Sequence, residues 1–147
     1  MKSNDYILCG SRSLIVRGLL HRKPKDLDLC LNRKTKAIKS FLKNINIDLL
    51  YPAFCDFDFI EHKGYKVKCM KVHQVLYFKY RFMKNIEKNT GTLYNKHYID
   101  LANVFHNLGR EQSINCIDDI YKIKPKLINK EELLMIMEIG LNNKEEI

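Results

Sequence analysis

The chain has 147 residues, of which 46% are hydrophobic and 29% are charged, with only 6 glycines and 3 prolines. This composition excludes a disordered chain and indicates one folded domain with a sizeable core. The formal net charge of +9 favours an anionic partner such as nucleic acid or a nucleotide, although a lysine-rich chain can also reflect a biased genome.

No apolar run approaches the ~20 residues needed to span a bilayer, and the first residues leave no room for a secretory signal. We therefore expect a soluble, cytoplasmic protein without a membrane partner. The cysteines are odd in number and form no Cys-x-x-Cys pair, so they indicate neither a disulfide framework nor a zinc site. We interpret them as apolar fillers of buried strands: Cys9, Cys30, Cys55, Cys69 and Cys116.

An apolar run at residues 6–9 ends at Gly10, which predicts a first strand followed by a Gly-Ser turn. Apolar spacing predicts a short helix over residues 12–20. If Ser11 caps that helix, the free backbone N–H groups and the positive end of the helix dipole face outward, ready for a phosphate. Gly10 lets the backbone approach such a ligand closely.

A basic loop follows, and Pro24 ends the helix before a second strand at residues 26–31. Asp26 and Asp28 lie two apart, so both side chains are expected on one face of that strand. Folding alone gives no reason to place two mutually repelling carboxylates there. A divalent cation supplies the reason, because magnesium is usually held by one or two carboxylates plus substrate phosphates. Arg22 in the loop is either a phosphate contact or solvated surface.

The next segments predict an amphipathic helix over residues 34–45 and an aromatic-rich strand over residues 51–60. Asp56 and Asp58 lie two apart on this strand. A Lys-Gly turn then leads to an antiparallel return strand at residues 65–69.

A helix is predicted from about residue 72 to residue 87, and Lys79 lies in the centre of its apolar stripe. A lysine buried there without a partner is costly. Its side chain is therefore expected either to reach the surface or to point into a cleft that holds anions.

A further apolar stripe predicts a helix that ends at Gly109. Lys96 and Asp100 lie four apart on another face of this helix, a spacing that by itself predicts only a surface ion pair worth a few tenths of a kcal/mol. In the tail, a polar connection leads to a last helix, for which Asn129 and Glu132 form a capping box.

The order of a Gly-Ser turn, a helix and a hydrophobic-Asp-hydrophobic-Asp-hydrophobic strand resembles the signature of the DNA polymerase beta-like nucleotidyltransferase superfamily. The Arg-Lys-Pro-Lys run before the acids and the later Lys-His-x-x-Asp-Leu element are similar to its small members. These are the minimal nucleotidyltransferases and the abortive-infection (AbiEii-type) toxin family. The similarity covers residues 7–108.

The resemblance implies an α+β (α/β-like) fold, in which a small mixed β-sheet is flanked by helices. Residues 1–109 would form the nucleotidyltransferase core. Residues 110–147 would form a helical extension packed on that core, which the resemblance leaves unexplained.

The resemblance also implies a metal site for Mg²⁺ or Mn²⁺, held by Asp26, Asp28 and a third carboxylate from a neighbouring strand. We assign the third position to Asp58, with Asp56 as its substitute. The nucleotide phosphates would be bound by a further set of residues: Gly10, Ser11, Arg22, Lys79 and Lys96, with Asp100 orienting Lys96.

The implied activity is transfer of a nucleoside monophosphate from a nucleoside triphosphate, such as ATP, onto a hydroxyl of RNA, for example a tRNA 3′ end, or of a protein. A toxin–antitoxin system with a cognate partner protein would fit this activity. The alternative is a non-catalytic binding protein of the same fold, kept as an antitoxin or adaptor. A third hypothesis is a small basic RNA-binding domain, which would be favoured if Asp26, Asp28 and Asp58 did not converge in space.

Overall fold

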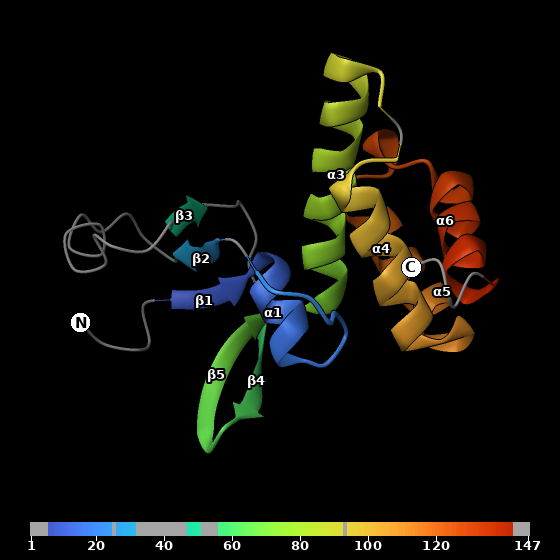
Figure 1. Ribbon diagram of the computed structural model, residues 1–147. Helices are drawn as coiled ribbons and strands as arrows, with labels where there is room; N and C mark the ends of the chain where they lie inside the picture. The colour runs from blue at the N-terminus through green and yellow to red at the C-terminus, as the bar shows by residue number, and fades with distance from the viewer. Residues whose placement is uncertain (1–5, 25, 32–46, 51–55, 93, 143–147) are drawn as a thin grey trace. The chain divides into compact units, whose positions relative to one another are not determined.

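The computed structural model describes residues 6–24, 26–31, 47–50, 56–92 and 94–142. The chain forms two compact units, Met1–Lys71 and Val72–Ile147. Among the described residues, the first unit, here called the strand unit, contains a β-sheet and one short helix, and the second, the helical unit, contains helices alone (Figure 1). The protein is therefore an α+β protein. The boundary expected at residue 109 falls inside the helical unit, between two of its helices.

The strand unit holds a five-stranded mixed sheet with the order β3-β2-β1-β5-β4. Strand β1 pairs antiparallel with β2 and parallel with β5, β2 pairs parallel with β3, and β4 pairs antiparallel with β5. The strands are β1 (Tyr6–Cys9), β2 (Leu27–Leu31), β3 (Ile47–Leu50), β4 (Phe57–His62) and β5 (Tyr65–Met70).

Four of these strands match predicted ones, and β3 was not predicted. Strand β2 begins one residue later than expected, so that Asp26 precedes it. The helix expected at residues 34–45 lies outside the described residues, and so do residues 51–55 of the strand expected at 51–60.

A short helix, α1 (Gly10–Val16), follows β1 directly. It ends earlier than expected because Gly18, at a φ of +76°, adopts the left-handed conformation that stops a helix. The N–H of Gly18 donates to the carbonyl of Ile15 at 3.0 Å, and that of Leu19 donates to the carbonyl of Leu14 at 2.9 Å. These two bonds form a Schellman motif, which satisfies the last carbonyls of α1.

Strands β4 and β5 form a hairpin whose turn is the predicted Lys-Gly pair. Lys63 and Gly64 have φ values of +51° and +84°. Two consecutive positive φ angles are typical of a type I′ turn, the geometry that matches the twist of a two-residue hairpin. The predicted turn is confirmed.

The core of the strand unit is built from buried apolar side chains of α1, the loop after it and three strands: Ile7, Cys9, Leu14, Leu20, Leu29, Cys30, Cys69 and Met70. All the described cysteines, Cys116 included, are buried thiols outside any disulfide. For these four, the interpretation as buried fillers is confirmed, and Cys55 lies outside the described residues. Burial raises the pKa of Cys116 to about 12, so this thiol stays protonated at neutral pH.

The helical unit contains α3 (Val72–Thr90), α4 (Lys96–Leu108), α5 (Arg110–Ile123), the 3₁₀ turn η2 (Pro125–Leu127) and α6 (Lys130–Asn142). Helix α4 packs against α3, α5 and α6. Helix α5 replaces the polar connection expected there. Its buried residues recur at helical spacing, and they are Ser113, Cys116, Ile117 and Ile120.

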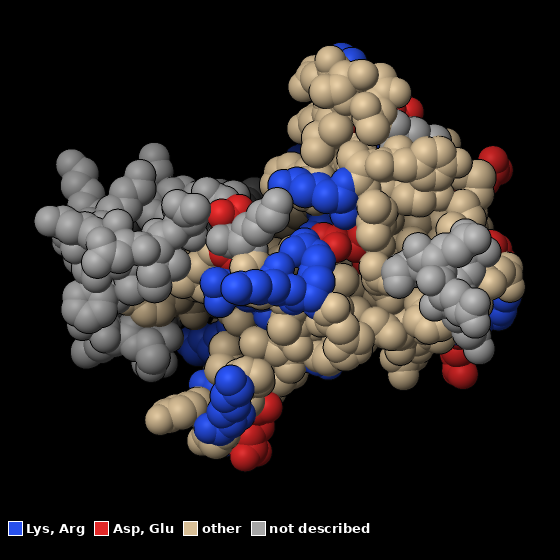
Figure 2. All heavy atoms as spheres, in the orientation of Figure 1, with Lys and Arg blue, Asp and Glu red and all other residues tan. Residues whose placement is uncertain are grey.

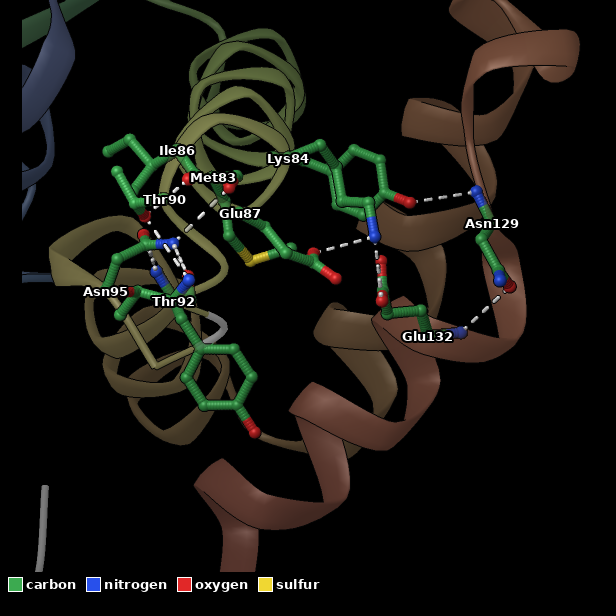
Figure 3. Close-up of polar contacts among 11 residues, drawn as sticks. Met83, Lys84, Ile86, Glu87, Thr90, Thr92, Asn95, Asn129 and Glu132 are labelled. Carbon is green, nitrogen blue, oxygen red and sulfur yellow. Dashed lines mark hydrogen bonds and ion pairs between the residues drawn. The ribbon is translucent and has the colours of Figure 1, made fainter.

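Asparagine side chains cap the starts of helices α4 and α6 (Figure 3). The side chain of Asn95 accepts from the N–H groups of His97 and Tyr98 at the start of α4. At the start of α6, the N–H of Glu132 donates to Oδ1 of Asn129 at 3.1 Å, which confirms Asn129 as the predicted cap. The Glu132 carboxylate accepts instead from Lys84 of α3, at 3.2 Å, and so ties α6 to α3.

Helices α4 and α6 approach closely at Gly140. A Cβ at this position would collide with the carbonyl oxygen of Ala102 and lie 3.0 Å from its carbonyl carbon. The ring Nδ1 of His106 also lies 3.0 Å from the Gly140 carbonyl oxygen. The tail helix is therefore packed tightly onto α4. In the described part of the chain, no helix combines the length and the apolar character needed to cross a membrane.

Candidate functional site

The two halves of the predicted site meet at Gly10 and Asp28. Both residues belong to the strand unit, where Asp28 of β2 pairs with Cys9, the last residue of β1. Gly10 has a φ of +64°, and a Cβ built on it would collide with Oδ2 of Asp28 and lie 2.7 Å from its Cγ. The carboxylate of Asp28 thus occupies the space that any other residue at position 10 would fill with its side chain.

Arginines hold the segments around this contact. The side chain of Arg22, in the loop after α1, donates to Oγ of Ser11 at 2.8 Å. Nε of Arg12 donates to the backbone carbonyl of Asp26 at 2.9 Å. The structure therefore brings five predicted site residues into one region of the strand unit: Gly10, Ser11, Arg22, Asp26 and Asp28.

The expectation that Ser11 caps a helix is wrong. Helix α1 begins at Gly10, and Cys9 occupies the cap position without a side-chain hydrogen bond. The positive φ of Gly10 turns the chain from β1 straight into the helix, so Ser11 falls within the first turn. Its hydroxyl is held by Arg22 instead, and α1 is a helix of only 7 residues.

Asp58 does not join Asp26 and Asp28. It lies on β4, at the far edge of the sheet, and β1 and β5 separate this strand from β2. Three strand spacings correspond to about 14 Å between the backbones. The expectation of convergence is not met because strand order, which residue spacing does not encode, places β4 beyond β5.

Asp58 instead receives two basic side chains. Nζ of Lys71 donates to its Oδ1 at 2.6 Å, and Arg17 donates to its Oδ2 at 2.8 Å. Arg17 also donates to the backbone carbonyls of Cys69 and Met70, at 3.4 and 3.1 Å. This cluster ties the end of α1 to the β4–β5 hairpin. The hydrogen bonds from Lys71 and from Arg17 hold the pKa of Asp58 below its ordinary value of 3.8.

The stability supplied by this cluster is expected to be lost in acid. A carboxyl group with a lowered folded pKa stabilises the fold above its unfolded pKa, near 3.8, and the gain disappears as the pH falls through the folded value. The Asp58→Asn variant lacks this pH-dependent stabilisation. Between about pH 6 and about pH 2, its urea-unfolding midpoint should therefore fall less steeply than that of the unmodified chain. The difference should be about 1 kcal/mol at most, because the carboxylate is partly exposed.

Glu61→Gln provides the matched control, since Glu61 is an exposed acid on the same strand. If both variants reduced the acid-induced fall of the urea-unfolding midpoint equally, the role of the Asp58 cluster would be refuted.

Asp48 is an acid that the sequence analysis did not select. It lies on β3, which pairs parallel with β2, and its register partner is Asp28. The two backbones are therefore one strand spacing apart, about 4.8 Å. The hydrophobic-Asp-hydrophobic triplet of residues 47–49 was the available signal, but its significance depends on a strand pairing that is visible only in the structure.

The other predicted acids and bases lie elsewhere. Asp56 is exposed just before β4, and its backbone carbonyl accepts from the N–H of Lys71 at 3.0 Å. Lys96 is exposed at the first turn of α4, in the helical unit. Their predicted roles in metal and phosphate binding stay predictions.

Lys79 takes neither of its expected positions. Its ammonium group is buried in the helical unit and donates to Oδ2 of Asp100 at 2.8 Å, with the two side chains 5% and 2% exposed. Asp100 thus pairs with Lys79 of α3 rather than acting only as a surface partner of Lys96. The buried ion pair joins α3 to α4.

Basic side chains gather over the part of the strand unit that holds α1 and the loop after it (Figure 2). Arg22 and Lys23 are exposed in that loop. Among the residues that the structure describes, no group of three His, Cys, Asp or Glu side chains is arranged to hold a metal ion. No protein-family model, curated protein or solved structure matches the chain.

Proposed function

We propose that the protein is a metal-dependent nucleotidyltransferase, which moves a nucleoside monophosphate from a nucleoside triphosphate onto a hydroxyl of RNA, such as a tRNA 3′ end, or of a protein. The observation that supports this proposal most is the contact of the Asp28 carboxylate with Gly10. It joins the Gly-Ser turn to the acid strand, in the order that resembles the DNA polymerase beta-like superfamily.

The donor atoms fit a hard divalent cation. Asp26 and Asp28 offer carboxylate oxygens, and magnesium needs only one or two carboxylates when substrate phosphates complete its shell. Asp48, one strand away from Asp28, replaces Asp58 as our candidate for a third carboxylate. When bound, Mg²⁺ or Mn²⁺ would neutralise charge on the triphosphate and favour ionisation of the attacking hydroxyl.

The chain's own residues would bind and orient the substrate. Ser11 and Arg22, already joined by a hydrogen bond, would bind the terminal phosphates, and Gly10 would let them approach the backbone. Such a reaction depends on alignment and charge neutralisation more than on a side-chain nucleophile. Pyrophosphate would leave as the acceptor oxygen bonds to the α-phosphorus.

The test is incubation with each α-labelled nucleoside triphosphate, Mg²⁺ or Mn²⁺, and total RNA or cell protein. Label should appear on one acceptor class, and Asp28→Asn should reduce transfer by at least about 100-fold, because one of the few charges that hold the metal is removed. The exposed Asp119, in the helical unit, provides the matched control Asp119→Asn, which should transfer normally.

Two further variants identify the third acid. If Asp48 supplies it, Asp48→Asn should lose transfer and Asp58→Asn should retain it. The opposite result would restore Asp58 as the third carboxylate.

The position of Asp58 favours a second candidate, a basic RNA-binding domain without catalysis, since the three acids first selected do not converge. RNA binding without label transfer under any condition, and without triphosphate binding, would support this candidate and overturn the transferase.

A further inference from the structure

The β4–β5 hairpin presents an aromatic and basic face that the proposed site does not use. Strand residues alternate between faces, and the register pairs Phe59 with Lys68 and Glu61 with Lys66. These four residues therefore share one face of the hairpin with Phe57. Strand β4 forms an edge of the sheet, and towards its tip the hairpin curves away from β1 (Figure 1).

One aromatic side chain of this face, that of Phe59, is largely exposed. Phe59 is 62% exposed, and its ring meets that of Phe57 edge to face, with centroids 5.3 Å apart. Nζ of Lys68 lies 4.8 Å from the Phe57 ring centroid and 5.9 Å from that of Phe59. A phenylalanine on an edge strand therefore has a large open ring surface with a positive charge beside it.

The surrounding charges are mainly basic. Lys63 and Lys66 are exposed near the tip, and Lys68 lies beside the rings of Phe57 and Phe59. Glu61 is the single exposed acid on this face. Asp58 lies on the other face, neutralised by Lys71 and Arg17. Figure 2 shows basic side chains at this end of the strand unit.

We propose that this hairpin face binds single-stranded nucleic acid. A base stacks on the open Phe59 ring, and Lys66 and Lys68 contact the neighbouring phosphates. Aromatic rings flanked by lysines are the general means of binding single strands, because every base offers a π-face while the backbone offers regular negative charge. A duplex keeps its bases stacked on each other, so it has no free base for Phe59.

The inference rests on the proposed function in one respect. If the protein is a nucleotidyltransferase, the bound strand is RNA, and RNA rather than protein is the acceptor. Binding itself needs neither a triphosphate nor a metal ion. The two proposals can therefore fail separately.

The test is fluorescence anisotropy of the full chain with a labelled single-stranded RNA of about 12 nucleotides, a length within the range of such sites, in EDTA and without nucleotide. Phe59→Ala should weaken binding by about tenfold or more, and Phe59→Trp should restore it, because the wider ring still stacks. Lys66→Ala should reduce the slope of log affinity against log salt by about 0.7, the value for one phosphate contact on a single strand.

Tyr94→Ala provides the matched control, since Tyr94 is 70% exposed and lies in the helical unit. It should bind like the unmodified chain. Equal affinity for the duplex, or unchanged affinity in Phe59→Ala, would overturn the inference. It would also be overturned if sedimentation showed a dimer that Phe59→Ala converts to a monomer while RNA binding stays the same, since the face would then belong to a second copy.

The outcomes also separate the two proposals. Phe59-dependent RNA binding without nucleotide transfer supports the hairpin inference and contradicts the transferase. Transfer onto RNA that Phe59→Ala leaves unaffected supports the transferase and contradicts the hairpin inference.

Discussion

Replacing Asp100 with alanine is expected to lower the free energy of unfolding of the helical unit by about 3–5 kcal/mol. Asp100 is 2% exposed and accepts from the buried Lys79 at 2.8 Å. Without the carboxylate, the lysine ammonium would remain in the interior without its counter-charge. The cost arises mainly from burying the ammonium group without the charge of Asp100, rather than from the loss of one hydrogen bond.

A double variant that removes both charges separates the cost of the buried ammonium charge from the cost of the lost hydrogen bond. Lys79→Met combined with Asp100→Leu removes both charges at similar volume, and this double variant should be close to the unmodified chain or more stable. Urea unfolding followed by circular dichroism measures the difference. Asp119→Ala, at an exposed acid of α5, provides the control and should change stability by no more than about 0.5 kcal/mol. A cost below about 1 kcal/mol for Asp100→Ala would contradict the argument.

Replacing Gly10 with alanine is expected to cost about 3 kcal/mol or more in stability, and also to remove the proposed nucleotide transfer. Two effects add at this position. The φ of +64° costs an L-residue about 1–2 kcal/mol, and the new methyl group would collide with the Asp28 carboxylate. Either the strand or the carboxylate must move, and both belong to the proposed site.

Gly18 provides a matched control for the backbone effect alone. It has a similar φ of +76° in the same unit, but a Cβ there would meet no atom within 4 Å. Gly18→Ala should therefore cost only about 1–2 kcal/mol. Adding Asp28→Ala to Gly10→Ala should recover part of the loss, because the atoms nearest the new methyl group are removed. Equal costs for Gly10→Ala and Gly18→Ala would show that the contact with Asp28 is unimportant.

Local signals in the sequence were sufficient for much of the fold. The Lys63-Gly64 pair specified its own turn, and Gly109 ends α4 as predicted. The side chain of Asn129 caps α6 by accepting a hydrogen bond from the N–H of Glu132, three residues later. In each case the interacting groups are at most a few residues apart, so the pattern and the structure it forms occupy the same short segment.

Helix α5 shows where a local interpretation fails. Its segment is polar on average, and the sequence analysis took it for a connection. The four residues that it buries recur at intervals of three, one and three residues, a pattern that favours a helix once a packing surface exists. Helices α3, α4 and α6 supply that surface, and most helical stability comes from such packing rather than from propensity.

The sequence by itself determined the types of most elements, because these depend on spacing within one segment. Only the tertiary structure decided the partners: the strand of Asp48 rather than that of Asp58 beside the strand of Asp28, Arg17 and Lys71 on Asp58, and Asp100 on Lys79. Those pairings join residues 13 to 41 positions apart. They follow from strand order and helix packing. Both depend on many weak contacts across a whole unit, so they cannot be predicted from the spacing of a few residues.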